Sequence, residues 1–187
     1  ANFELDKIYE IYKYAQDIEK WSILIPNSNN KFKTNQIQQI DNCEASVFLI
    51  NRDVVLKGKM FDENIFFYFE ELDYFSRLNL TKYKVLLLPK LTFSHTQGGS
   101  VNSSIIKDVS NIQQWHYLWS MFYVYKKKTN YINALKIIFP FIIKDILKLF
   151  YYLLTLNFKL ANKRLYRISG AVNSIVGRSS YKRPKNI

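Results

Sequence analysis

The chain has 187 residues and is 48 % hydrophobic, which allows one sizeable buried core and excludes an intrinsically disordered chain. Cys43 is the only cysteine in this sequence, so a disulfide framework and a cysteine-rich zinc site are excluded and a reducing compartment is indicated. The formal charge of +12 is uneven, because residues 1–100 carry 12 Lys/Arg and 13 Asp/Glu whereas residues 101–187 carry 15 and 2. Such an asymmetry predicts an anionic partner, either nucleic acid or a membrane surface.

The first hundred residues alternate between predicted helices and strands. Apolar residues at helical spacing behind Asp6 predict an amphipathic helix over residues 6–20. Short apolar runs predict four strands, at residues 21–25, 47–50, 83–88 and 91–94. A loop of mostly small residues, TQGGSVNSS, follows His95. The alternation predicts α/β layers up to about residue 100.

The stretch FDENIFFYFEELDYFSR, residues 61–77, combines seven aromatic residues with five carboxylates. Aromatic rings favour burial, whereas carboxylates are rarely buried without a partner. A helix that starts here at the edge of a cleft satisfies both, because the rings can pack inward while the acids gather where a polar ligand arrives. The stretch is therefore the candidate active site.

A helix that begins at Glu70 places Glu70, Asp73 and Arg77 on one face, with Asp73 and Arg77 four residues apart and able to pair. Glu71 points about 100° away from Glu70. The helix dipole stabilises carboxylates of the first turn as anions, ready to accept a proton or to bind a cation. An ordinary solvated helix start carries the same acids, so the residue types alone leave a catalytic and a structural interpretation open.

From Ile112 onward the pattern is helical. Residues 133–167 have the pattern of one amphipathic helix, which Pro140 is expected to kink or interrupt. Its apolar runs of seven or eight residues are shorter than the ~20 needed to cross a bilayer. Four lysines share one sector and are the predicted contacts to an anionic membrane surface: Lys144, Lys148, Lys159 and Lys163. Alternatively, these helices only close the hydrophobic core, and the lysines form the solvent-exposed face of the helices.

Other chemistries find less support in the residues. The C-terminal part lacks the Gly/Arg-rich and aromatic patterns of single-strand binders, which argues against a nucleic-acid partner. No Ser-His-Asp order, nucleophile elbow, phosphate-binding loop or dinucleotide fingerprint is present, so hydrolase, kinase and dehydrogenase functions are not indicated. His116, inside QQWHYLW, is expected to pack within the protein rather than to bind a ligand.

The segments FDENIFFYFEELDYFSRL and VLLLPKLTFSHTQGGS resemble, in order, the second half of inverting nucleotide-sugar glycosyltransferases of the GT-A fold. The most similar members are rhamnosyltransferase-like enzymes that build bacterial surface polysaccharides such as lipopolysaccharide and capsule. The shared pattern is Phe-Asp-Glu, aromatic residues, Glu-Asp-x-Asp and Arg, followed by a strand, Pro and a His-x-x-Gly-x-Ser loop. The residues that match it are Asp62, Glu63, Tyr68, Glu70, Asp73, Arg77, Pro89, His95 and Ser100.

The resemblance extends over most of the chain. ANFELDKIYEIYK resembles the helix after the family's metal-binding loop, EASVFLINRDV resembles the strand under the sugar site, and SGAVNSIVGR is similar to the glycine-bearing terminus. It implies a partial GT-A (Rossmann-like) sheet with flanking helices in residues 1–104. A helical, basic amphipathic and membrane-associating region would follow in residues 105–187.

The resemblance also implies roles for individual residues. Glu71, which stands where Asp is usual in the family, would be the base that takes the proton from the acceptor hydroxyl. Glu70 and Asp73 would hold the acceptor. The implied substrate contacts are Asp62, Glu63, Arg77, His95, Gly99 and Ser100. His95 would lie near the leaving diphosphate, as a ligand of a divalent Mg or Mn ion, or would alternatively be satisfied by a backbone partner at a strand end.

The implied partners are a nucleotide-sugar donor and a lipid-linked or glycan acceptor, at the cytoplasmic side of the bacterial inner membrane. In the family, the nucleotide-binding half and its metal motif precede the helix expected at residues 6–20. The resemblance therefore implies that a separate N-terminal half or another copy completes the enzyme, or that the chain is a non-catalytic, membrane-docked relative.

Overall fold

The computed structural model describes residues 21–24, 37–40, 48–50, 52–57, 60–78, 80, 83–88 and 106–184. The chain divides into two compact units. We call Ala1–Phe61 with Glu71–Gly99 the sheet unit, and Asp62–Glu70 with Ser100–Ile187 the helical unit. Residues 62–70 therefore group with the C-terminal helices, although the predicted division places them in the first domain.

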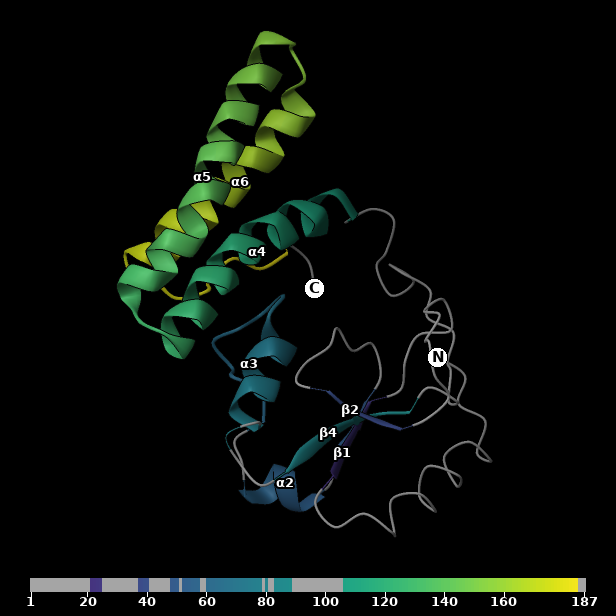
Figure 1. The fold of residues 1–187 in the computed structure, drawn as a ribbon. Coiled ribbons are helices and arrows are strands. Elements are labelled where there is room, and N and C mark those ends of the chain that lie inside the picture. The colour runs from purple at the N-terminus through teal and green to yellow at the C-terminus, as the bar shows by residue number, and fades with distance from the viewer. Residues whose placement is uncertain are drawn as a thin grey trace. The chain divides into compact units, whose positions relative to one another are not determined.

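The sheet unit is built on a mixed sheet with the strand order β2-β4-β1-β3 (Figure 1). Its strands are β1 (Trp21–Leu24), β2 (Gln38–Ile40), β3 (Phe48–Ile50) and β4 (Lys84–Leu87). β1 and β4 are parallel, whereas β3 pairs with β1 and β2 pairs with β4 in antiparallel register. Residues 85–88 are all buried, as expected for an inner strand that is covered on both faces.

Three of the four predicted strands are confirmed as β1, β3 and β4. The strand predicted at residues 91–94 and the helix predicted at residues 6–20 lie outside the described residues. β2 was not predicted, because its sequence, QQI, has one apolar residue and no alternation. Most of the described residues are helical and the sheet is small, so the expected combination of a sheet-bearing part and a helical part holds at this coarse level.

Two helices supply the rest of the core of the sheet unit. They are α2 (Arg52–Lys57), which was not predicted because it is barely longer than one helical turn, and α3 (Glu70–Leu78). The buried cluster they form with the sheet consists of Val54, Tyr74, Phe75, Leu78 and Val85. Tyr74, Phe75 and Leu78 of α3 are thus part of the same buried cluster as Val85 of β4.

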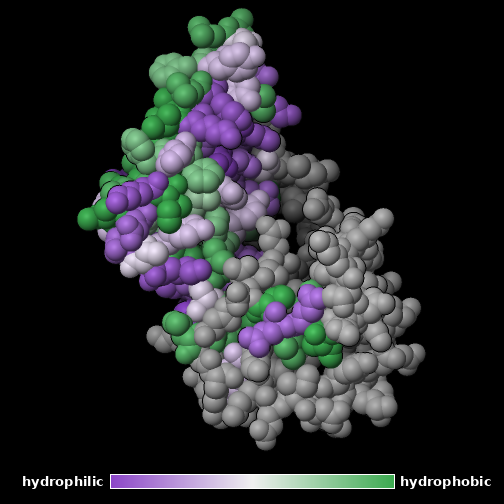
Figure 2. Space-filling model, in the orientation of Figure 1, coloured by the Kyte–Doolittle hydropathy of each residue, from purple (hydrophilic) through white to green (hydrophobic). Residues whose placement is uncertain are grey.

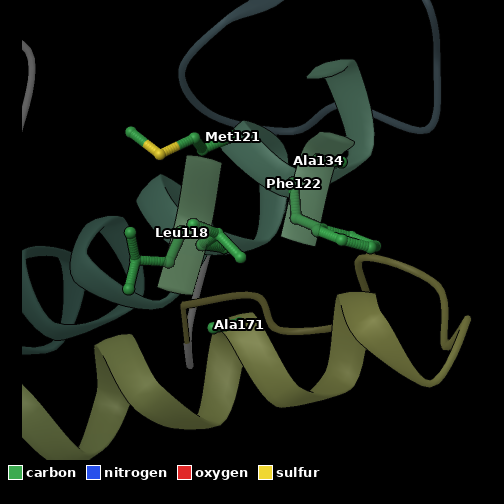
Figure 3. Packing of buried hydrophobic residues seen from close by; sticks show 6 residues of the cluster. Leu118, Met121, Phe122, Ala134 and Ala171 are labelled. Atoms are coloured by element: carbon green, nitrogen blue, oxygen red, sulfur yellow. The ribbon is translucent and has the colours of Figure 1, made fainter. Parts of the chain in front are cut away.

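The helical unit consists of α4 (Ile106–Lys128), α5 (Tyr131–Leu154) and α6 (Phe158–Ile175), together with residues 62–70 and the C-terminal segment. α4 packs on both other helices. α5 and α6 lie side by side as a hairpin whose closed end extends beyond α4 (Figure 1). Figure 3 shows the core where the three helices meet, formed by Leu118, Met121, Phe122, Ala134, Ile138 and Ala171.

The single long helix predicted over residues 133–167 is wrong. α5 ends at Leu154, and Leu156 adopts the left-handed backbone conformation with φ 54°, so the chain reverses direction. Asn157 then caps α6, because its side chain accepts a hydrogen bond from the backbone N–H of Leu160 at 3.2 Å. The expected interruption at Pro140 is also absent, since α5 continues through this residue.

The backbones of α6 and α4 approach each other closely at Gly170. A Cβ atom added to Gly170 would lie 1.9 Å from the carbonyl oxygen of Trp115. Only glycine allows this approach, and it brings Ala171 into the three-helix core. Gly170, the first of the two glycines in SGAVNSIVGR, therefore has a packing role.

Gly170→Ala is expected to lower the free energy of unfolding by about 1–3 kcal/mol, because α6 must move away from α4 to admit the methyl group. The sign of the change in unfolding free energy is informative, because alanine in place of glycine within an unhindered helix stabilises the protein by roughly 1 kcal/mol. Urea unfolding followed by circular dichroism measures the change. Val172→Ala, on the exposed side of α6, is the control, and a Gly170→Ala variant as stable as the parent would contradict the close approach.

Candidate active site

The acidic stretch forms the helix expected of it. α3 begins at Glu70, so Glu70 and Glu71 occupy its first turn and Asp73 the next positions. Glu70 is the last residue of the Asp62–Glu70 segment of the helical unit, while Glu71 and Asp73 belong to the sheet unit. Both glutamates are half-buried. The predicted helix start is confirmed, and it places carboxylates where the helix dipole stabilises negative charge.

Asp73 and Arg77 form the predicted pair. Arg77 Nε donates to Asp73 Oδ2 at 2.9 Å, and Asp73 is only 1 % exposed. The guanidinium also donates to the backbone carbonyl of Met60 and lies 5.7 Å from the ring centroid of Tyr74. A buried carboxylate needs such a partner, so the pair ties α3 to the residue just before the acidic stretch.

Glu70 is the carboxylate that lacks a full set of partners. Its Oε2 is buried and has no hydrogen bond among the described residues. Burial raises the pKa of Glu70 above its ordinary value, although a bond from its own backbone N–H acts in the opposite direction. The pKa of the Tyr68 hydroxyl is also raised, first by burial and then by the charges of Glu70 and Tyr117. Glu70 is thus suited to accept a hydrogen bond from a hydroxyl group or to exchange a proton.

Each carboxylate oxygen of Asp62 accepts two hydrogen bonds. Lys127 Nζ lies 2.6 Å and Tyr123 Oη 3.0 Å from Oδ2, while the backbone N–H of Asn64 lies 3.0 Å and its side chain 2.8 Å from Oδ1. Burial alone would raise the pKa of Asp62, but these bonds together lower it well below the usual range. Asp62 is therefore an anion that joins its loop to α4. Glu63 is exposed, and the predicted substrate contacts of both acids stay predictions.

The chain enters α3 through two strained residues. Tyr68 and Phe69 both adopt the left-handed conformation, with φ of 63° and 68°. This conformation costs roughly 1–2 kcal/mol for each non-glycine residue. α4 compensates, because Ser120 Oγ donates to the carbonyl of Phe67 at 2.7 Å and the ring of Tyr117 packs 5.6 Å from those of Tyr68 and Phe69. Strain held in this way immediately before Glu70 is typical of functional sites.

The α4 side chains that organise this stretch were not among the predicted site residues. They are His116, Tyr117, Ser120, Tyr123 and Lys127, each about 50–65 residues along the chain from what it contacts. Lys127 belongs to the run of three lysines in the last turn of α4. Helical spacing of these side chains was visible, but nothing in the pattern named their partners.

His116 packs inside the helical unit, as expected. Its ring lies between Phe66, Phe67 and Trp115, with centroid distances of 4.8–5.9 Å. Nε2 lies 2.8 Å from the carbonyl oxygen of Lys182, so it carries the proton and donates. Nδ1 is buried without a hydrogen-bond partner among the described residues. Burial lowers the pKa of His116 to about 4, with Arg183 acting in the same direction and the bond to Lys182 against it.

Acid is therefore expected to destabilise the protein through His116. The unfolded chain takes up the proton near pH 6.5, whereas the folded protein takes it up only near pH 4, so stability falls as the pH decreases across this interval. The loss is about 3 kcal/mol at most. Urea unfolding at several pH values measures it. His116→Gln should flatten the dependence, His95→Gln should keep it, and identical slopes for the parent and His116→Gln would contradict the assignment.

The predicted residues of the following loop, His95, Gly99 and Ser100, lie outside the described residues. Within the described ranges, no group of three or more His, Cys, Asp or Glu side chains is arranged to hold a metal ion. In the helical unit the strained Tyr68 and Phe69 precede Glu70, and in the sheet unit Glu71 is half-buried and Asp73 pairs with Arg77. Comparison with protein-family models, with curated proteins and with solved structures found no match for this chain.

Proposed function

We propose that the protein is a glycosyltransferase that moves a hexose, such as rhamnose, from a nucleotide-sugar to a lipid-linked or polysaccharide acceptor with inversion. The enzyme would act in the synthesis of a bacterial surface polysaccharide, at the cytoplasmic side of the inner membrane. The proposal includes a fold equivalent to the acceptor-side part of a GT-A domain. It rests on the ordered series of motifs from Phe61 to Ser100 and on the helix start that presents their acids.

One observation carries the proposal. Three of the motif acids, Glu70, Glu71 and Asp73, stand in the first turns of α3, where Arg77 donates a hydrogen bond to Asp73. Glu71 remains in the position that the resemblance gives to the general base.

The proposed reaction is a single displacement. The acceptor hydroxyl oxygen forms a bond to the anomeric carbon, the bond from that carbon to the diphosphate oxygen breaks, and Glu71 takes the hydroxyl proton. Glu70, whose Oε2 lacks a hydrogen bond within the described residues, would hold the acceptor. A divalent Mg or Mn ion enters the proposal through the resemblance alone, because His95 lies outside the described residues.

A transfer assay tests the proposal. The complete gene product that carries these residues is incubated with Mg²⁺ or Mn²⁺, a panel of nucleotide-sugars and membrane lipid extract as acceptor. Release of nucleoside diphosphate together with a glycosylated lipid or glycan is expected for one donor. Absence of transfer with every donor, in a protein shown to be folded, would contradict the proposal.

A non-catalytic relative that docks another protein or a membrane is the second candidate. It is favoured by the observation that Asp62 and Asp73 already have partners within the chain. Calorimetric titration with the same nucleotide-sugars discriminates, because tight, metal-dependent binding would exclude this candidate.

A further inference from the structure

The α5–α6 hairpin carries an apolar stripe that is exposed among the described residues. On α5 it follows helical spacing along the side opposite the core: Phe139, Ile143, Leu147, Phe150 and Leu154, of which Leu154 is 85 % exposed. The stripe continues at the closed end of the hairpin through Leu156 and Phe158. In Figure 2, hydrophobic side chains gather along the edge of this helix pair and at its end. Monomeric proteins rarely expose so continuous an apolar surface without a partner.

The opposite side of α5 cannot exchange places with this stripe. Ala134 and Ile138 are fully buried in the three-helix core. Asp145 is also buried, with Oδ1 2.9 Å from Arg164 Nη1 and Oδ2 2.6 Å from Arg167 Nε on α6. Rotation of α5 would break this ion cluster and empty the core, so the apolar stripe must face outward.

The charge of the hairpin selects the partner. Residues 131–175 contain seven Lys/Arg and one acidic residue, which is Asp145 and is buried against two arginines. No carboxylate is therefore exposed on the hairpin, whereas Lys136, Lys144 and Lys159 are exposed beside or within the apolar surface. An uncovered apolar stripe with cationic flanks is complementary to a lipid surface with anionic headgroups. A second copy would bring the same positive charges together.

None of the described helices combines the length and the hydrophobicity needed to span a membrane. We propose that the hairpin lies on an anionic lipid surface, with the stripe from Phe139 to Leu154 and the closed end inserted among the headgroups and the lysines against the phosphates. The predicted membrane lysines thus act from two antiparallel helices, and the apolar stripe, rather than one lysine sector, is the main contact. This proposal does not depend on sugar transfer.

Flotation of the full chain with vesicles tests it. We expect binding to vesicles of phosphatidylcholine mixed with phosphatidylglycerol and at least about tenfold weaker binding to phosphatidylcholine alone, because each lysine near an anionic surface contributes roughly fivefold. Leu147→Glu with Phe150→Glu should reduce binding to the anionic vesicles by roughly a hundredfold, since two apolar anchors are lost. Lys144→Gln with Lys159→Gln should reduce it about tenfold or more.

Variants on other surfaces control for the kind of substitution. Leu80→Glu replaces an exposed leucine of the sheet unit, and Arg52→Gln with Lys128→Gln removes two exposed charges elsewhere. These variants should bind the vesicles like the parent, and circular dichroism should show all variants folded. No binding of the parent to anionic vesicles, or equal binding to both vesicle types, would overturn the proposal. So would a concentration-dependent dimer that Leu147→Glu dissociates while vesicle binding is unchanged.

Discussion

Asp145→Ala is expected to lower the free energy of unfolding by about 3–5 kcal/mol, the usual cost of removing one partner from a buried ion cluster. Asp145 is 2 % exposed, and it is the carboxylate that Arg164 and Arg167 both contact. Without it, two guanidiniums remain together in a largely dry interface between α5 and α6. Urea unfolding followed by far-ultraviolet circular dichroism measures the loss.

Two further variants separate charge burial from other effects. Lys144→Ala changes the neighbouring, exposed residue of the same helix and should alter stability by no more than about 0.5 kcal/mol. Replacement of the whole cluster, Asp145→Leu with Arg164→Met and Arg167→Met, should recover most of the loss because no charge is then stranded. If Asp145→Ala were as stable as the Lys144→Ala control, the ion cluster would not be what holds α5 and α6 together.

The hairpin also shows where prediction from a linear pattern fails. Angular positions calculated for one continuous helix placed four lysines in one sector, but the turn after Leu154 resets the register, so the calculation does not apply beyond it. The sequence carried a usable signal in Asn157, a residue type that favours N-caps. The pattern instead predicted a kink or an interruption at Pro140, but α5 continues through this residue.

The sheet shows the complementary case. Strands that are buried on both faces have consecutive apolar residues, so the apolar run at residues 85–88, which includes most of β4, was sufficient to predict this strand. β2 is three residues long and its glutamines contribute backbone hydrogen bonds rather than side-chain burial. Ile40 packs against the buried cluster of the sheet unit, and one apolar side chain is too few to make a periodic pattern.

The candidate site divides in the same way. The start of α3 and the Asp73–Arg77 pair are local, four residues apart, and helical spacing was enough to predict both. The bonds from Tyr123 and Lys127 to Asp62 join segments more than 60 residues apart, and no periodicity encodes such a contact. Without aligned relatives, long-range partners of this kind come only from the folded structure.

Glu71→Gln is expected to reduce sugar transfer by about 10²–10⁴-fold, the usual contribution of a general base, while leaving the fold intact. Glutamine keeps the shape and hydrogen-bonding reach of Glu71 but cannot take the proton of the acceptor hydroxyl. Glu71→Asp keeps a carboxylate and introduces the residue usual in the resembling family, so transfer should stay within about 10²-fold of the parent, the cost that a shift of about 1 Å can impose. Initial rates at saturating donor, with thermal unfolding of each variant as the fold control, measure both changes. Parent-like turnover by Glu71→Gln would remove Glu71 from the role of base and leave Glu70, with its unsatisfied Oε2, as the carboxylate to test next.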